Sequence, residues 1–136
     1  MTEVSKSICF LLSKAYQRAC ALYKDKFDHY ELTPQQFGLL RFLWEEDGLT
    51  QVELSNRSQI DRTTIGGLID RLEQSGLLVR LPHPEDRRAY RISLTDAGKK
   101  LEKELTPLAE ELQNAILAPL SPEETTSLTT ILLKLR

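Results

Sequence analysis

Residues 58–95 read SQIDRTTIGGLIDRLEQSGLLVRLPHPEDRRAYRISLT, and this stretch decides the fold. Its first half predicts a helix, because apolar residues recur at helical spacing while the opposite face stays polar or bare. Asp61 stands where an N-cap belongs, since its side-chain oxygen can accept hydrogen bonds from the free N–H groups of the first turn. The apolar stripe behind it consists of Ile65, Leu68, Ile69 and Leu72.

Two adjacent glycines, Gly66 and Gly67, lie inside this predicted helix. Each is unfavourable in a helix by roughly 1 kcal/mol relative to alanine, so helix propensity does not select them. Close approach of another backbone is one interpretation. Relief of crowding inside the protein is the alternative.

The periodicity changes after Gly76. Residues 77–81 and 89–94 are strand-like, and the polar, proline-rich segment 82–88 joins them. This pattern predicts a β-hairpin with a basic tip, called the wing below. Upstream, Thr50 and Glu53 form a capping box that predicts a short helix to about residue 57.

A short helix, a break at residues 58–60, a second helix with a polar head and then a hairpin form the pattern of a winged helix-turn-helix. The fold class expected is therefore mainly α with a small β-hairpin wing.

Longer helices flank this unit at both ends. Apolar spacing predicts one helix from residue 3 to about residue 30 and another that is opened by Thr33 and ended by Gly48. After the wing, Thr95 should cap a long helix, and Pro107 should kink or break it because it removes a backbone donor. Ser121 opens a last helix.

The apolar stripes of the outer helices are larger than a small winged helix can cover, so we expect them to pair with a second copy. The predicted organisation is a single domain over residues 1–136. Residues 1–32 and 96–136 would form dimerisation helices around a winged helix-turn-helix at residues 33–95.

Charge and composition limit the classes of function that the chain can have. The net charge of −2 argues against a generic polyanion binder, but residues 57–91 hold seven Lys and Arg against five Asp and Glu, whereas the remainder holds eleven against fifteen. A basic middle is expected where the central third contacts phosphates. The N-terminus lacks a signal-peptide pattern and no apolar run is long enough to span a membrane, so a cytoplasmic protein is expected.

Catalysis is not indicated. The chain has two histidines, no Cys/His cluster with metal-ligand spacing and no glycine-rich phosphate loop, so we expect no enzyme, metal or cofactor. A protein-binding adaptor is the other alternative, because winged helices can act without nucleic acid. The basic wing together with Arg62 and Thr64 favours DNA instead.

The wing carries a family resemblance. The run from Asp86 to Thr95, followed by Asp96-Ala97-Gly98, resembles the D-x-R-x5-L-T-x-x-G signature of the MarR family of transcriptional regulators. Residues 61–65, 68–73 and 76–77 are similar to the recognition helix of that family. The resemblance implies a dimeric winged helix-turn-helix repressor or activator that releases a pseudo-palindromic operator when a small molecule or an oxidant reaches it.

In the wing, Arg88 is the main candidate for DNA contact, because a guanidinium at a wing tip can enter the narrow, negative minor groove. Asp86 would orient Arg88 by ion pairing. Arg87, Arg91 and His83 would contact phosphates and fix register. The same basic residues could instead form an ordinary solvated hairpin, since such residues guard exposed strand edges.

In the helix, Arg62, Thr63 and Thr64 are placed to reach base edges or phosphates in the major groove. Gly66 and Gly67 would let the helix lie deep in that groove. Arg71 flanks this face and joins the candidate DNA contacts.

The input signal has two candidates. Cys9 resembles the reactive cysteine of the organic-hydroperoxide-sensing branch of the family, and Tyr16, Cys20 and Tyr23 share its helix face. Its thiolate could be oxidised to a sulfenic acid, or Cys9 could be a small core residue. Cys9 and Cys20 lie about 16 Å apart along one helix, so both should be free thiols.

The other candidate input is a small aromatic or anionic effector bound between the dimerisation helices and the winged helix. Aromatic residues could line such a crevice or simply belong to the core. They are Phe27, His29, Tyr30, Phe37 and Trp44.

Overall fold

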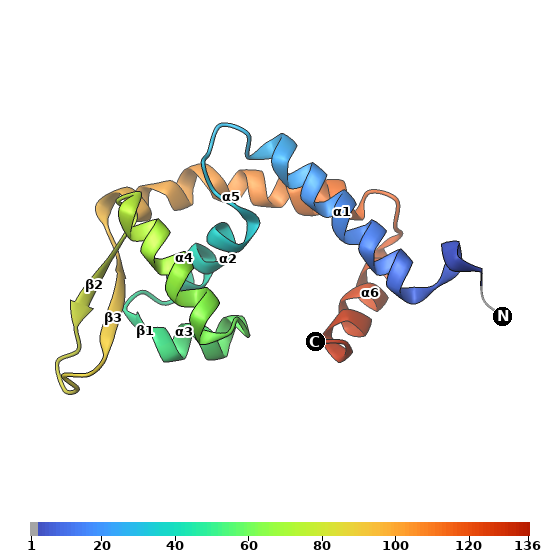
Figure 1. The fold of residues 1–136 in the computed structure, drawn as a ribbon. Coiled ribbons are helices and arrows are strands. Elements are labelled where there is room, and N and C mark those ends of the chain that lie inside the picture. The colour runs from blue at the N-terminus through green and yellow to red at the C-terminus, as the bar shows by residue number, and fades with distance from the viewer. Residues whose placement is uncertain (1–2) are drawn as a thin grey trace. The chain divides into compact units, whose positions relative to one another are not determined.

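The structure is a computed structural model, and it describes residues 3–136 (Figure 1). It confirms the mainly helical fold class with a small antiparallel sheet as the wing. The helices are α1 (Ile8–Lys26), preceded by a 3-10 turn (Val4–Lys6), α2 (Pro34–Glu45), α3 (Gln51–Ser58), α4 (Arg62–Gln74), α5 (Asp96–Leu117) and α6 (Pro122–Lys134), and the strands are β1 (Leu49–Thr50), β2 (Leu78–Pro82) and β3 (Tyr90–Leu94).

The helix starts that were predicted from capping residues are confirmed, because each has its capping side chain in place. Thr33, Thr50 and Ser121 each accept the backbone N–H three residues later, and the Gln or Glu at that position bonds back to the cap. Thr95 likewise accepts the Gly98 N–H at 3.1 Å at the start of α5. Local sequence alone therefore sets these boundaries.

Two helices have limits that differ from those expected. The first helix begins at Ile8 and not at residue 3, because the Ser7 hydroxyl accepts the Phe10 N–H and caps it, and it ends at Lys26. The second ends at Glu45, before Gly48, whose φ of +78° makes the turn into β1.

The expected break at Pro107 is wrong. Helix α5 runs without interruption from Asp96 to Leu117, with Pro107 inside it. A proline removes one backbone donor, and the 22-residue helix keeps its hydrogen bonds on both sides of that gap. Just before the proline, the Thr106 hydroxyl donates to the Glu102 carbonyl at 2.7 Å.

The sheet has three strands in the order β1-β3-β2, so the wing is more than the predicted hairpin. Strand β3 is central and antiparallel to both neighbours, with Leu49 opposite Ile92 and Leu78 opposite Leu94. Strand β1 has only two residues, which is too short to show an alternating pattern in the sequence.

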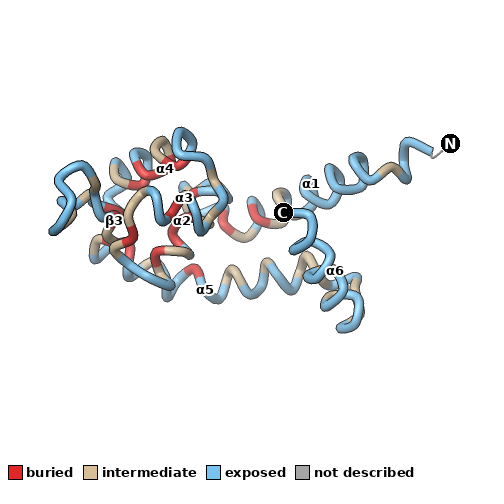
Figure 2. The backbone as a smooth tube through the Cα atoms, turned by 90° about the horizontal axis from the view of Figure 1, so that it is seen from below, coloured by how far each residue is buried: buried red, intermediate tan, exposed pale blue. Residues whose placement is uncertain are grey.

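The chain divides into two compact units, one made of residues 30–106 and the other of the two terminal segments, 3–29 and 107–136. Buried positions of the first unit gather around α2, α3, α4 and β3 (Figure 2). The Trp44 indole donates to the Gly98 carbonyl at 3.0 Å, and the Phe37 ring lies edge-on to Trp44. These two aromatic side chains therefore pack within the first unit.

The second unit holds α1, the end of α5 and α6. Arg18 donates to the carbonyls of Ala115 and Ile116 at 2.8 and 2.7 Å. Tyr23 and Phe27 are buried and stack with ring centroids 4.4 Å apart. Large apolar side chains of this unit are nevertheless exposed, and they include Val4, Ile8, Leu11, Leu12, Ile131, Leu132, Leu133 and Leu135.

No helix among residues 3–136 combines the length and the apolarity that a membrane crossing requires.

Candidate nucleic-acid interface

The head of α4 is fixed by its cap. The Asp61 carboxylate accepts both the backbone N–H and the hydroxyl of Thr64, each at 2.8 Å. These hydrogen bonds hold the pKa of Asp61 below its usual range. Because the Thr64 hydroxyl donates to Asp61, Thr64 presents its methyl group and its oxygen lone pairs to an incoming ligand. Arg62 and Thr63 are exposed beside it.

The glycine pair is not explained by crowding inside the protein. A Cβ added at Gly67 would meet nothing within 4 Å, and one added at Gly66 would meet only the end of the Gln51 side chain at 3.3 Å. The buried stripe of α4 is the predicted one, Ile65, Leu68, Ile69 and Leu72, and the glycines lie off it. The chain itself thus leaves open space beside this part of the helix.

One pocket of about 450 Å³ gathers candidate residues from both the helix and the wing. Arg62 from α4 and His83, Asp86 and Arg88 from the wing all line it. Arg62 and Arg88, which are 26 positions apart in the sequence, are thereby brought to one site, with two guanidinium groups and an imidazole around it. The other lining residues are Thr50, Gln51, Val52, Ala89 and Tyr90.

Asp86 holds Arg88 mainly through the backbone. Its Oδ1 accepts the Arg88 N–H at 2.9 Å, whereas the Arg88 Nε lies 4.0 Å from the same oxygen. The Arg88 side chain is 96% exposed, so its charge is available to a ligand. The neighbouring Arg87 is also exposed.

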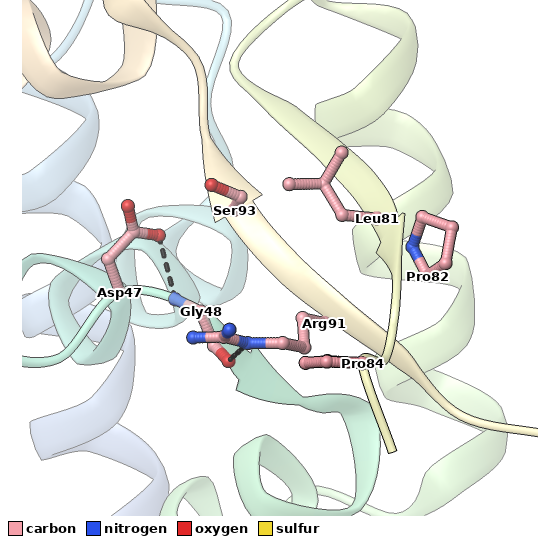
Figure 3. Close-up of a pocket in the computed structure, with 7 residues that line it drawn as sticks. All are labelled: Asp47, Gly48, Leu81, Pro82, Pro84, Arg91 and Ser93. Atoms are coloured by element: carbon pink, nitrogen blue, oxygen red, sulfur yellow. Dashed lines mark hydrogen bonds between the residues drawn. The ribbon is translucent and has the colours of Figure 1, made fainter. Parts of the chain in front are cut away.

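Arg91 is engaged elsewhere. Its Nε donates to the Gly48 carbonyl at 3.0 Å, and it lines a second pocket of about 360 Å³ between the wing and the turn before β1 (Figure 3). Next to it, the Asp47 carboxylate accepts the backbone N–H groups of Gly48 and Leu94 at 2.9 and 2.8 Å. Arg91 thus braces the base of the wing.

Sequence reasoning missed an ionic clamp between α4 and β2. The Arg80 guanidinium lies 2.7 Å from the Asp70 carboxylate and 2.8 Å from that of Glu73. The Arg80 backbone N–H also donates to Glu73, at 3.2 Å. The charge of Arg80 is therefore paired with carboxylates of the protein itself. Arg71, which lies on α4 between Asp70 and Glu73, stays exposed.

Gln51 and Tyr90 were also missed, and both line the pocket that holds Arg62 and Arg88. Neither carried a signal, because Gln51 is merely the first residue after a cap and Tyr90 merely begins a strand.

The cysteines of the second unit are free, as predicted. Cys9 is exposed and Cys20 is partly buried. A hydrogen bond with Cys20 raises the pKa of Tyr16, so Tyr16 is paired with Cys20. Burial raises the pKa of Tyr23 to about 12. Among residues 3–136, no group of three potential metal ligands occurs.

Comparison with known proteins agrees with this geometry. The profile of the MarR family matches residues 32–90, which include α2, α3, α4 and the wing loop. The HTH-type transcriptional repressor NicR of Pseudomonas putida is 30% identical over 133 residues, which cover 98% of this chain and 84% of NicR. The chain belongs to the MarR family.

Two further relatives bear on how this MarR-family chain works. The organic hydroperoxide resistance transcriptional regulator of Bacillus subtilis is 32% identical over 101 residues, or 74% of this chain and 69% of the relative. The solved structure of Bordetella bronchiseptica BpsR, whose DNA binding is regulated by 6-hydroxynicotinic acid, superposes with a TM-score of 0.93 at 30% identity, over 99% of this chain and 96% of BpsR. The chain is a DNA-binding transcriptional regulator.

Proposed function

We propose that this MarR-family chain is a transcriptional repressor that binds a pseudo-palindromic operator as a homodimer and is released by a small anionic aromatic molecule. One observation carries the DNA interface: Arg62, His83 and Arg88 surround one exposed pocket. Asp86 is the acidic residue among those that line the pocket, and its Oδ1 lies 4.0 Å from the Arg88 Nε. Such a group suits the negative phosphates and the negative minor groove of DNA.

The helix α4 lies in the major groove in this proposal. Arg62 and Thr63 reach base edges or phosphates, and the Thr64 methyl group contacts a thymine methyl, because its hydroxyl already donates to Asp61. The open space beside Gly67 receives the DNA backbone, and at Gly66 the nearest atom is the end of the Gln51 side chain.

The wing contributes Arg88 to the minor groove, while Arg87 and the helix residue Arg71 contact phosphates. Arg91 supports the wing through its hydrogen bond to Gly48 and leaves its terminal nitrogens for phosphate.

The exposed apolar side chains of α1 and α6 support the homodimer, since an exposed apolar surface of this extent marks an interaction site. Two copies would place two α4 helices about one turn of DNA apart, or a multiple of it. We accordingly assign residues 1–32 and 96–136 to dimerisation, and residues 33–95 to DNA recognition, within a single domain. We propose that the protein acts in the cytoplasm, where it would meet its operator.

The effector class comes from the relatives. BpsR is regulated by 6-hydroxynicotinic acid, a small aromatic acid, and it resembles this chain over nearly its whole length. We propose an effector of that kind and no enzymatic activity.

Fluorescence anisotropy tests the proposal with a labelled duplex from upstream of the chain's own gene and a shuffled duplex as reference. We expect preferential binding to the upstream duplex, and release on titration with 6-hydroxynicotinic acid or a related aromatic acid. Arg88→Ala should weaken binding by about tenfold or more, the scale of a lost charged groove contact. Arg41→Ala, which removes an exposed guanidinium from α2, is the matched control and should bind normally. Equal affinity of wild type and Arg88→Ala would refute the role given to the wing. No preference of the wild type for the upstream duplex would favour a protein-binding adaptor.

A thiol-based peroxide sensor is the second candidate, because Cys9 is exposed and the Bacillus subtilis hydroperoxide regulator is a relative. Its test is the same binding assay before and after stoichiometric organic hydroperoxide. Release by the wild type but not by Cys9→Ser would support the sensor. Retention of DNA by both would leave the aromatic effector as the input.

A further inference from the structure

The tip of the wing is organised around one imidazole. The Nδ1 of His83 accepts the backbone N–H groups of both Glu85 and Asp86, each at 3.1 Å. Within segment 81–90, His83 and Ala89 are partly buried while the other residues are exposed, and the backbone N–H of His83 donates to the Ala89 carbonyl at 3.2 Å. The imidazole therefore lies inside the turn that it holds.

These bonds continue to the candidate DNA-contacting arginine. The Asp86 carbonyl accepts the Ala89 N–H at 3.2 Å, and the Asp86 carboxylate accepts the Arg88 N–H at 2.9 Å. The chain of contacts thus runs from His83 through Asp86 to the backbone of Arg88. Since the Arg88 side chain has 96% of its surface exposed, these backbone hydrogen bonds are the main restraint on the position of its guanidinium.

An Nδ1 that accepts two N–H groups uses its lone pair and carries no hydrogen, so the ring nitrogen left to donate is Nε2. The two ring nitrogens then have separate tasks: Nδ1 bonds to the loop, and Nε2–H remains for a phosphate. A direct phosphate contact and a positioning role are therefore distinguishable by chemistry, because they use different atoms.

We propose that His83 is a positioning residue, whose Nδ1 folds the wing tip so that Asp86 and Arg88 are set for DNA. The effect of His83 on DNA binding rests on the proposed function, whereas the hydrogen bonds that fold the wing tip do not. A phosphate donor would act through Nε2, which bonds to nothing within the described structure. Nδ1, in contrast, makes both of the side chain's hydrogen bonds.

Two substitutions distinguish the role of Nδ1 from that of Nε2. In asparagine, Oδ1 stands at the same number of bonds from the backbone as Nδ1 of histidine, so His83→Asn keeps the loop acceptor and removes Nε2. Asparagine side chains bond to backbone N–H groups two residues on in the same way. In His83→Gln the polar group is one bond further out, near the reach of Nε2, and the loop acceptor is lost.

Limited trypsin digestion of the full chain tests the fold of the tip without DNA, because Arg87 and Arg88 are exposed cleavage sites inside the turn. We expect His83→Asn to be cut there at the wild-type rate. His83→Gln should be cut on the order of tenfold faster, the scale of losing two backbone hydrogen bonds. An unchanged melting temperature for both variants shows that the rest of the chain is folded.

Operator binding completes the test, and we expect His83→Asn to bind like wild type and His83→Gln to bind several-fold more weakly. The proposal is overturned if His83→Asn is cut faster than wild type, if His83→Gln is cut no faster, or if His83→Gln keeps full affinity while His83→Asn loses it. Failure of the wild type to bind the upstream duplex would refute the proposed function, while the cleavage rates would still decide the role of His83.

Discussion

Replacing Gly67 by alanine should make the protein more stable and its DNA binding weaker. A Cβ at this position meets nothing within 4 Å, so the full helix-propensity difference between alanine and glycine, about 1 kcal/mol, should appear as extra unfolding free energy. For a chain of 136 residues this corresponds to a melting temperature about 4 °C higher.

The same methyl group would point into the space that DNA is proposed to occupy. Inserting a methyl group into a close-packed contact costs typically 1–3 kcal/mol, so the operator Kd should rise about fivefold or more. Gly38→Ala in α2 is the matched control, because a Cβ there also meets nothing within 4 Å and Gly38 lies outside the proposed interface. It should raise stability equally and leave the Kd unchanged.

Urea unfolding at one fixed protein concentration measures the stability, because association of two copies makes it concentration-dependent. Anisotropy on the upstream duplex at constant salt measures the Kd. The reasoning about Gly67 fails if its alanine variant binds DNA as tightly as wild type. A Gly38→Ala variant with the same loss of affinity would show that the effect is not local to α4.

Three further outcomes are expected. Arg88→Ala should lower the slope of log Kobs against log salt by about 1 without changing the melting temperature, as a salt titration of binding will show. Arg80→Leu should lower the unfolding free energy by about 1 kcal/mol in urea, because two half-exposed carboxylates lose their partner, whereas Arg57→Ala, which breaks one exposed pair, should change it little. The pKa of Asp61 is lowered in the folded protein by the Thr64 hydrogen bonds, so its contribution to stability is present above its unfolded pKa and is lost as the pH falls below about 4. Asp61→Asn keeps the cap but not the charge, so its stability should depend less on pH below 4, and an unchanged acid profile would contradict this assignment.

Much of the fold could be predicted from the sequence because its signals are local. Capping residues such as Thr33, Thr50 and Asp61 determine where helices begin through bonds that span three residues. The stripe of α4 follows from helical spacing, and all four of its apolar side chains are buried. The wing signature was likewise visible as a linear pattern, and it led to the family that the comparisons show.

The errors have a common physical cause. Strand β1 exists because Leu49 and Thr50 find partners 43 and 41 residues away on β3, which leaves no local periodicity to detect. The bond from Arg91 to Gly48 spans 43 residues, and the clamp of Arg80 on Asp70 and Glu73 joins a helix to the strand after it across a turn. The same cause applies to the candidate site, because Gln51 and Tyr90 line its pocket only as a result of tertiary packing.

The sequence by itself therefore determined the helices, their caps, the apolar stripe of α4 and the basic character of the wing, since these depend on neighbours within a few residues. Tertiary structure alone decided which of the basic side chains are free. Arg88 is exposed, whereas Arg80 is clamped and Arg91 is bonded to Gly48, although all three read alike as arginines in one segment. It also explains the last glycine of the wing signature: a Cβ at Gly98 would collide with the Leu77 carbonyl. The sequence shows which residues are charged. Whether a charge is available to a ligand depends on partners that only folding brings within hydrogen-bond distance.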